Sequence, residues 1–149
     1  MQRPFESLML QVVLVPLVAV LQLFGVYVLL HGHYGPGGGF VAGIMLAGGM
    51  ILPRLAGQSS DRLSLGPTSA ALVAVCGILV FVAVAVAPMF AGGPPLDYAA
   101  LPIGATDAAR RSMGILLIEV GVTLAVAGAM LAIFFALAAP VGGAEPTRD

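Results

Sequence analysis

The sequence predicts an all-α integral membrane protein with four transmembrane helices. Of the 149 residues, 60% are hydrophobic and only 9% are charged, and the mean hydropathy is +1.08. Soluble domains carry roughly 25% charged residues, so this chain is too apolar for a soluble fold. It contains four apolar runs, and a helix needs about 20 apolar residues to cross a bilayer. The runs are too long for strands and lack their two-residue alternation.

We expect the four spans to form a single membrane domain over residues 1–149. The second run, Phe40–Leu52, is short and reaches spanning length only if its helix begins near Pro36. Proline fits the first turn because its missing N–H is not needed there. Thr106 and Asp107 offer an N-cap for the fourth helix. The expected spans are 8–30, 36–56, 68–88 and 112–139, with a short polar tail at 140–149.

The distribution of arginines favours an N-in, C-in orientation. The chain has no lysine, and four arginines would lie on the cytoplasmic side against two, Arg110 and Arg111, outside. Positive charge is enriched in cytoplasmic loops. In this orientation the turn after the first span and the long loop before the fourth face outward. The net charge of −1 gives no basic face for nucleic acid.

A glycine-rich motif joins the first two spans. It reads His-Gly-His-Tyr-Gly-Pro-Gly-Gly-Gly-Phe over residues 31–40. Its unpaired backbone groups cannot lie against lipid, so it is expected at the membrane surface, against protein or in a wet cavity. The residues we single out are His31, His33, Pro36, Gly37, Gly38, Gly39 and Phe40.

The sequence favours neither an enzyme nor a metal or cofactor site. No acid or cysteine lies near His31 and His33 to complete a tetrahedral metal site. The three glycines of the motif lack the Lys-Ser/Thr of a nucleotide-binding loop. No nucleophile is paired with a base. We therefore expect no catalytic residues, no metal and no cofactor.

Small residues recur at four-residue spacing in two spans. Gly39, Gly43 and Ala47 share a stripe in the second span, and Gly121 begins a similar stripe with Ala125 and Ala129 in the fourth. Such stripes let membrane helices approach closely. The sequence leaves open whether they pack within this chain or against a neighbouring subunit.

Two glutamines form a polar stripe on the first span. Gln11 and Gln22 are 11 residues apart and so lie about 20° apart around a helix. Buried amides in a membrane require hydrogen-bond partners. Their side is expected to face a neighbouring helix or, as the other interpretation, a hydrated path.

Glu119 is the acid inside an apolar run, and Thr123 follows one turn later on the same face. An intramembrane carboxylate is a functional hypothesis in its own right, and the Thr123 hydroxyl could hydrogen-bond it. Three interpretations remain open: a proton- or ion-linked role, a structural pairing, or a position at the membrane interface.

These residues resemble the MnhB/MrpB subunit family of the Mrp-type multisubunit Na⁺/H⁺ antiporters. The likeness rests on the residues 31–40 motif, the four spans, the Leu101-Pro-Ile-Gly104 segment and the Glu119-Val-Gly-Val122 step, and it covers roughly residues 8–139. The resemblance implies an accessory subunit in the cytoplasmic membrane of bacteria or archaea. It also implies partner subunits, namely the complex I-like subunits A and D and the small subunits C, E, F and G.

Within such a complex we expect Pro36–Phe40 to dock against a partner and Glu119 to help conduct or gate the coupled ion, Na⁺ or H⁺. Two other functions remain open. One is a homologous subunit of a membrane-bound hydrogenase-like complex. The other is an autonomous small channel that assembles as a homo-oligomer through its glycine stripes.

Overall fold

The computed structural model describes residues 4–32, 37–56 and 65–138, with side chains from residue 12 onward. Its long helices are α1 (Pro4–His31), α2 (Gly38–Leu55), α3 (Pro67–Phe90) and α4 (Asp107–Ala138), and the short 3-10 helix η2 (Tyr98–Ala100) lies between α3 and α4. All four long helices are apolar and long enough to cross a membrane. The predicted fold class is confirmed.

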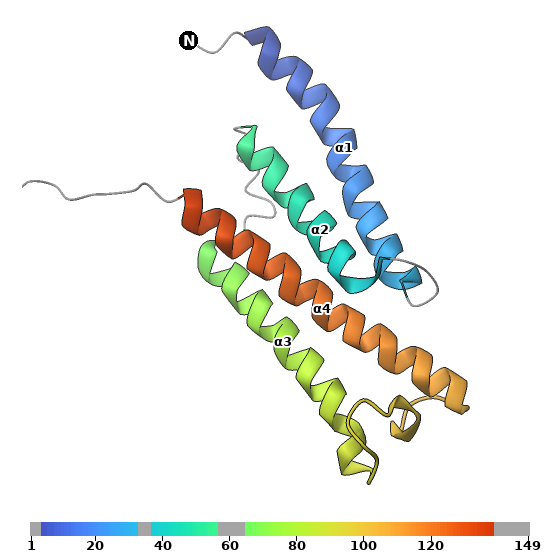
Figure 1. Cartoon of the computed structure of the whole chain (residues 1–149). Coiled ribbons are helices and arrows are strands. Elements are labelled where there is room, and N and C mark those ends of the chain that lie inside the picture. The colour runs from blue at the N-terminus through green and yellow to red at the C-terminus, as the bar shows by residue number, and fades with distance from the viewer. Residues whose placement is uncertain (1–3, 33–36, 57–64, 139–149) are drawn as a thin grey trace, which may run out of the picture.

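The helices lie side by side in the order α1, α2, α4, α3 (Figure 1). α4 packs along both α2 and α3, whereas α1 packs mainly on α2. In the described part of the chain α2 and α3 do not contact each other. α4 is therefore the central helix, and it joins an α1–α2 hairpin to an α3–α4 hairpin.

Glycines set the separation of α3 and α4. A Cβ atom built at Gly77 of α3 would lie 2.6 Å from the Gly121 carbonyl oxygen of α4. A Cβ built at Gly121 would in turn lie 2.8 Å from the Phe81 nitrogen, and one at Gly128 would lie 2.7 Å from the Ala70 oxygen. Because the obstructing atoms are backbone atoms, the two helices touch main chain to main chain, as small residues allow in membranes.

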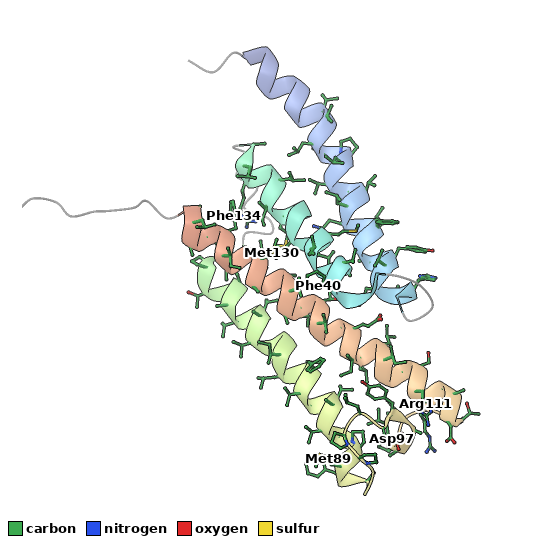
Figure 2. All side chains as sticks on the ribbon, in the orientation of Figure 1. Phe40, Met89, Asp97, Arg111, Met130 and Phe134 are labelled. Carbon is green, nitrogen blue, oxygen red and sulfur yellow. The ribbon has the colours of Figure 1, made fainter. Side chains whose placement is uncertain are left out.

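The outer faces of α1 and α3 carry large apolar side chains without cover (Figure 2). Leu23 of α1 is 73% exposed and Leu79 of α3 is 62% exposed. In water such faces would be unfavourable at about 25 cal/mol per Å² of apolar surface. They are suited to contact with lipid or with the membrane helices of other proteins.

The loop between α3 and α4 folds back onto the first turns of α4. The Thr106 hydroxyl accepts a hydrogen bond from the Ala109 N–H at 3.2 Å, which confirms the predicted N-cap. Arg110 donates to the carbonyl oxygens of Ala99 and Gly104, each at 3.3 Å. The Tyr98 ring lies against Gly114, and its burial raises the pKa of the Tyr98 hydroxyl above the ordinary value.

Arg54 ties three segments together at the other end of the molecule. Its guanidinium donates to the Met50 carbonyl of α2 at 2.7 Å and to the Leu65 carbonyl just before α3 at 3.3 Å. The same group lies 5.3 Å from the centre of the Phe135 ring of α4, within range of a cation–π interaction. The end of α2 and the start of α3 are thus held at one level.

Three helix starts differ from the expected spans by more than one residue. α1 begins at Pro4 rather than at residue 8. α2 begins at Gly38 rather than near Pro36, since Gly37 has φ +142° and ψ −74°, far from helical values. Pro36 itself lies outside the described residues. α4 begins at Asp107, five residues before the expected start at 112, because the Thr106 cap admits a polar first turn.

Candidate functional site

The carboxyl group of Glu119 lies beside Gly32, which follows α1, and Gly38, the first residue of α2. A Cβ built at Gly38 would lie 3.2 Å from Glu119 Oε1, and one at Gly32 would lie 2.9 Å from Oε2. Oε2 is buried, while the residue as a whole is half-buried. The motif and the acid, which are far apart in the sequence, therefore form a single site.

Only glycines can form this contact. Gly38 has φ +59°, in the left-handed region that glycine adopts without a steric penalty. A Cβ at Gly39 would overlap the backbone carbonyl of Glu119. The start of α2 is consequently pressed against α4 at Glu119. Gly32, which closes the other side of the carboxyl, was not singled out from the sequence, although it stands inside the motif.

The position of the carboxyl suits the start of a helix. The first N–H groups of a helix have no partner within the helix, and the N-terminus favours negative charge. α2 has no acid in its first turn, and its N-cap, Gly37, makes no side-chain cap hydrogen bond. When ionised, Glu119 supplies from α4 the negative charge that α2 does not carry itself.

Thr123 links the same two helices. Its hydroxyl is buried and lies 3.0 Å from the Gly39 carbonyl oxygen and 2.8 Å from the Glu119 carbonyl oxygen. The sequence suggested a bond to the Glu119 carboxyl, and the observed geometry differs: both acceptors are backbone oxygens. Threonine hydroxyls commonly bond the carbonyl one turn back, and the Gly39 carbonyl lies within reach because Gly39 has no side chain.

We expect Thr123→Val to weaken the α2–α4 contact without changing its shape. Valine has nearly the volume of threonine, so the change removes the hydroxyl and leaves the packing, at a cost of about 0.6–1.7 kcal/mol for an interhelical bond in a membrane. Thermal unfolding of the purified protein in detergent measures the loss. Thr123→Ser keeps the hydroxyl, and equal destabilisation by both variants would assign the effect to packing.

The small-residue stripes are used inside this chain. Gly43 faces the Thr123 carbonyl and Val126 of α4, and Ala47 is fully buried. The close approach that we expected Gly39 to make with a partner is made instead with α4. On α4 the stripe from Gly121 continues through Gly128 rather than Ala129, which is exposed. Seven residues return to the same face of a helix, whereas eight do not.

The two histidines and Phe40 occupy different surroundings. His31 ends α1, stacks on Tyr27 at 4.4 Å between ring centres, and its Nδ1 lies 3.1 Å from the Tyr27 carbonyl oxygen. Since a carbonyl only accepts, a hydrogen bond here requires the tautomer in which Nδ1 carries the proton. Phe40 is 59% exposed and so does not pack into this site. His33 lies outside the described residues.

Gln22 joins α1 to α2. Its Nε2 donates to the Leu46 carbonyl at 3.1 Å, and a Cβ at Gly49 would lie 2.5 Å from the same nitrogen. The amide therefore bonds a neighbouring helix, the first of the two interpretations of the polar stripe. The side chain of Gln11 lies outside the described residues.

Gln22→Leu is expected to loosen the α1–α2 hairpin. The change removes one interhelical hydrogen bond. It also places a branched side chain against Gly49, and overpacking of this kind lowers the stability of the hairpin by roughly 1–3 kcal/mol more. Protease sensitivity of α1 in native membranes reports the effect. Leu23→Gln, on the exposed face, is the control; equal sensitivity in both variants would show that the position of Gln22 is unimportant.

Comparison with known proteins agrees with this architecture. The family described as a domain related to the MnhB subunit of Na⁺/H⁺ antiporter matches residues 9–132. The B subunit of the Na⁺/H⁺ antiporter of Bacillus subtilis strain 168 is 35% identical over 115 residues, covering 72% of this chain and 80% of that protein. Proteins named for antiporter subunit mnhB2 are 32% identical in Staphylococcus saprophyticus over 125 residues and in Staphylococcus aureus strain Newman over 121 residues, each covering 80% of this chain and 86% of the relative. The chain belongs to the MnhB family, a family of antiporter subunits rather than of enzymes.

Proposed function

We propose that this chain is an accessory subunit of a multisubunit Na⁺/H⁺ antiporter, required for assembly and for ion coupling. The relatives named as antiporter subunits support the assignment. The exposed apolar faces of α1 and α3 offer the area that further membrane subunits need. The complex I-like subunits A and D and the small subunits C, E, F and G are the proposed partners.

The observation that carries the proposal is the solitary position of Glu119. Within the described spans Val12–His31, Gly38–Leu55, Pro67–Phe90 and Asp107–Ala138, the acids are Glu119 and Asp107, and Asp107 lies in the first turn of α4. Carrying protons across a bilayer requires a chain of ionisable groups. One acid beside one end of α2 does not form such a chain, so the transport path must be completed by other subunits.

We propose that Glu119 responds to protons. Its carboxylate lies at the positive end of α2, where ionised and protonated forms differ in their interaction with the helix. Protonation weakens the hold of α4 on the start of α2, and ionisation restores it. We propose that Thr123 and the motif glycines position the acid and that Glu119 couples ion movement in the neighbouring subunits to this contact.

The proposed location is the bacterial cytoplasmic membrane, with both termini inside. In that orientation the glycine-rich turn and the η2 loop face outward. A cysteine introduced at Ala105, which is exposed in the loop, should react with a membrane-impermeant reagent in intact cells. Reaction only in inverted vesicles would reverse the orientation.

Mass spectrometry of the tagged chain, purified from native membranes in mild detergent, tests the function. Recovery with several larger hydrophobic subunits, two of them complex I-like, is the expected result. Recovery with redox subunits would indicate a hydrogenase-like complex instead. Recovery alone, or as a homo-oligomer, would contradict the proposal; the glycine stripes already pack within the chain, which leaves a homo-oligomer without the interface expected for it.

A further inference from the structure

Main-chain contacts join α2, α4 and α3 into one unit. A Cβ built at Gly39 of α2 would overlap the carbonyl of Glu119, and one at Gly43 would lie 2.9 Å from the Thr123 carbonyl oxygen of α4. Gly77 of α3 meets the backbone of α4 in the same way. A main-chain atom cannot turn aside as a side chain can, so α2 and α3 cannot shift on α4 without losing these contacts. We expect the three helices to keep their relative positions.

α1 is attached through side chains and lies at the edge of the molecule, beside α2 (Figure 1). Gly25 of α1 faces the side chains of Met45 and Leu46, and Gly49 of α2 faces the side chain of Gln22. The Gln22 amide, which bonds the Leu46 carbonyl, ends a flexible side chain. Side chains can change rotamer, and packed helices slide on one another through such small adjustments. Among the contacts of the described residues, those between α1 and α2 therefore resist a displacement least.

The carboxyl of Glu119 stands between the end of α1 and the start of α2. Its Oε2 would lie 2.9 Å from a Cβ built at Gly32, which follows α1, and its Oε1 would lie 3.2 Å from one built at Gly38, where α2 begins. The C-terminal end of a helix carries partial negative charge, and the N-terminal end carries partial positive charge. An ionised carboxyl therefore repels the end of α1 and attracts the start of α2, whereas a neutral carboxyl does neither.

The other charged side chains of these helices lie away from the carboxyl or face another group. His31, in the last turn of α1, stacks on Tyr27, and Arg54, at the far end of α2, bonds the Met50 carbonyl. The remaining charged residues of α4 lie eight or more residues before Glu119, at least about 12 Å along the helix, and are Asp107, Arg110 and Arg111. The charge that changes between the two helix ends is therefore that of Glu119.

We propose that α1 shifts against the unit of α2, α3 and α4 when Glu119 changes between its ionised and neutral forms. The main-chain contacts at Gly39 and Gly43 hold α2 in both forms, so the change in repulsion displaces α1. The outer face of α1, where Leu23 is 73% exposed, carries the displacement to a neighbouring subunit. The displacement gives the response proposed for Glu119 its moving element, and it rests on that proposed function only for its purpose, because it can be measured without antiport.

Distances between pairs of spin labels test the displacement. In a Cys76→Ala background, Leu79→Cys on α3 is labelled together with either Val13→Cys on α1 or Leu55→Cys on α2, in the protein purified in mild detergent with its partner subunits. Val13 and Leu55 are 64% and 69% exposed and so accept a label, and each lies toward the end of its helix that is remote from Glu119. Both pairs are measured with Glu119 and with Glu119→Gln, whose amide keeps the size of the carboxyl but cannot ionise.

We expect Glu119→Gln to change the distance between the labels at Val13 and Leu79 by about 2 Å, the usual size of helix shifts at interfaces, and to leave the Leu55–Leu79 distance unchanged. An unchanged Val13–Leu79 distance would overturn the proposal, and so would an equal change in both pairs, because α2 would then move with α1. Glu119→Asp draws the charge back from both helix ends by one methylene, so it should also move α1 alone, and it decides by itself if Glu119→Gln does not assemble. Partner recovery and antiport are measured separately, so a fixed α1 and a wrong function remain distinguishable.

Discussion

Gly39→Ala is expected to separate the α1–α2 hairpin from α4 and to sharply lower the yield of assembled complex. The added methyl group would overlap the backbone carbonyl of Glu119, an atom that cannot turn aside as a side chain would. Overpacking of this kind costs roughly 1–3 kcal/mol and occasionally more. It would also displace the Gly39 carbonyl from the Thr123 hydroxyl. Co-purification of partner subunits with the tagged chain measures the loss.

Gly48→Ala is the matched control for this prediction. Gly48 lies in the same helix, and a Cβ built there meets no atom within 4 Å. Alanine is favoured over glycine in helices by about 1 kcal/mol, so this variant should assemble at least as well as the wild type. Normal yield of Gly39→Ala would show that the α2–α4 contact is less rigid than its geometry indicates.

Glu119→Gln is expected to preserve assembly and to reduce antiport. Glutamine keeps the volume and the polarity that fill the space between Gly32 and Gly38, but it carries no negative charge and does not release a proton. We expect the rate to fall roughly tenfold, which corresponds to about 1.4 kcal/mol of activation free energy. Na⁺-dependent pH changes in inverted vesicles give the rate, normalised to the amount of complex.

Glu119→Asp separates charge from position. It retains the acid but shortens the side chain by one methylene, so it should recover part of the rate if ionisation is what matters. Wild-type rates in Glu119→Gln would reduce the acid to a packing residue. Failure of Glu119→Gln to assemble, with normal assembly of Glu119→Asp, would instead make the charge itself structural, as a cap for α2.

Much of the architecture follows from local properties of the sequence. The four helices were predictable because length and hydropathy alone determine which segments cross a bilayer. The Thr106 cap was predictable because capping involves neighbouring residues. The start of α2 was not predictable from the sequence. Glycine can adopt the positive φ that Gly37 has, but no neighbouring residue in the sequence dictates it.

The candidate site was predictable in its parts but not in its assembly. The sequence indicated the motif and Glu119, yet nothing in their spacing places Gly38 against a residue 81 positions later. It suggested that Thr123 bonds a carboxyl, whereas the structure directs the hydroxyl to two carbonyl groups. The small-residue stripe on α4 was expected to run from Gly121 through Ala125 to Ala129. In the structure Gly128, rather than Ala129, makes the contact with α3.

The sequence by itself thus determined the class of protein, its four spans and the residues that depart from an apolar pattern. Only the tertiary structure decided that the glycines pack within the chain and that the carboxyl of Glu119 lies beside Gly32 and Gly38. The reason is physical. Insertion into a membrane depends on the summed hydropathy of each segment, which the sequence contains. Helix register depends on main-chain contacts between helices, and these exist only once the helices have packed.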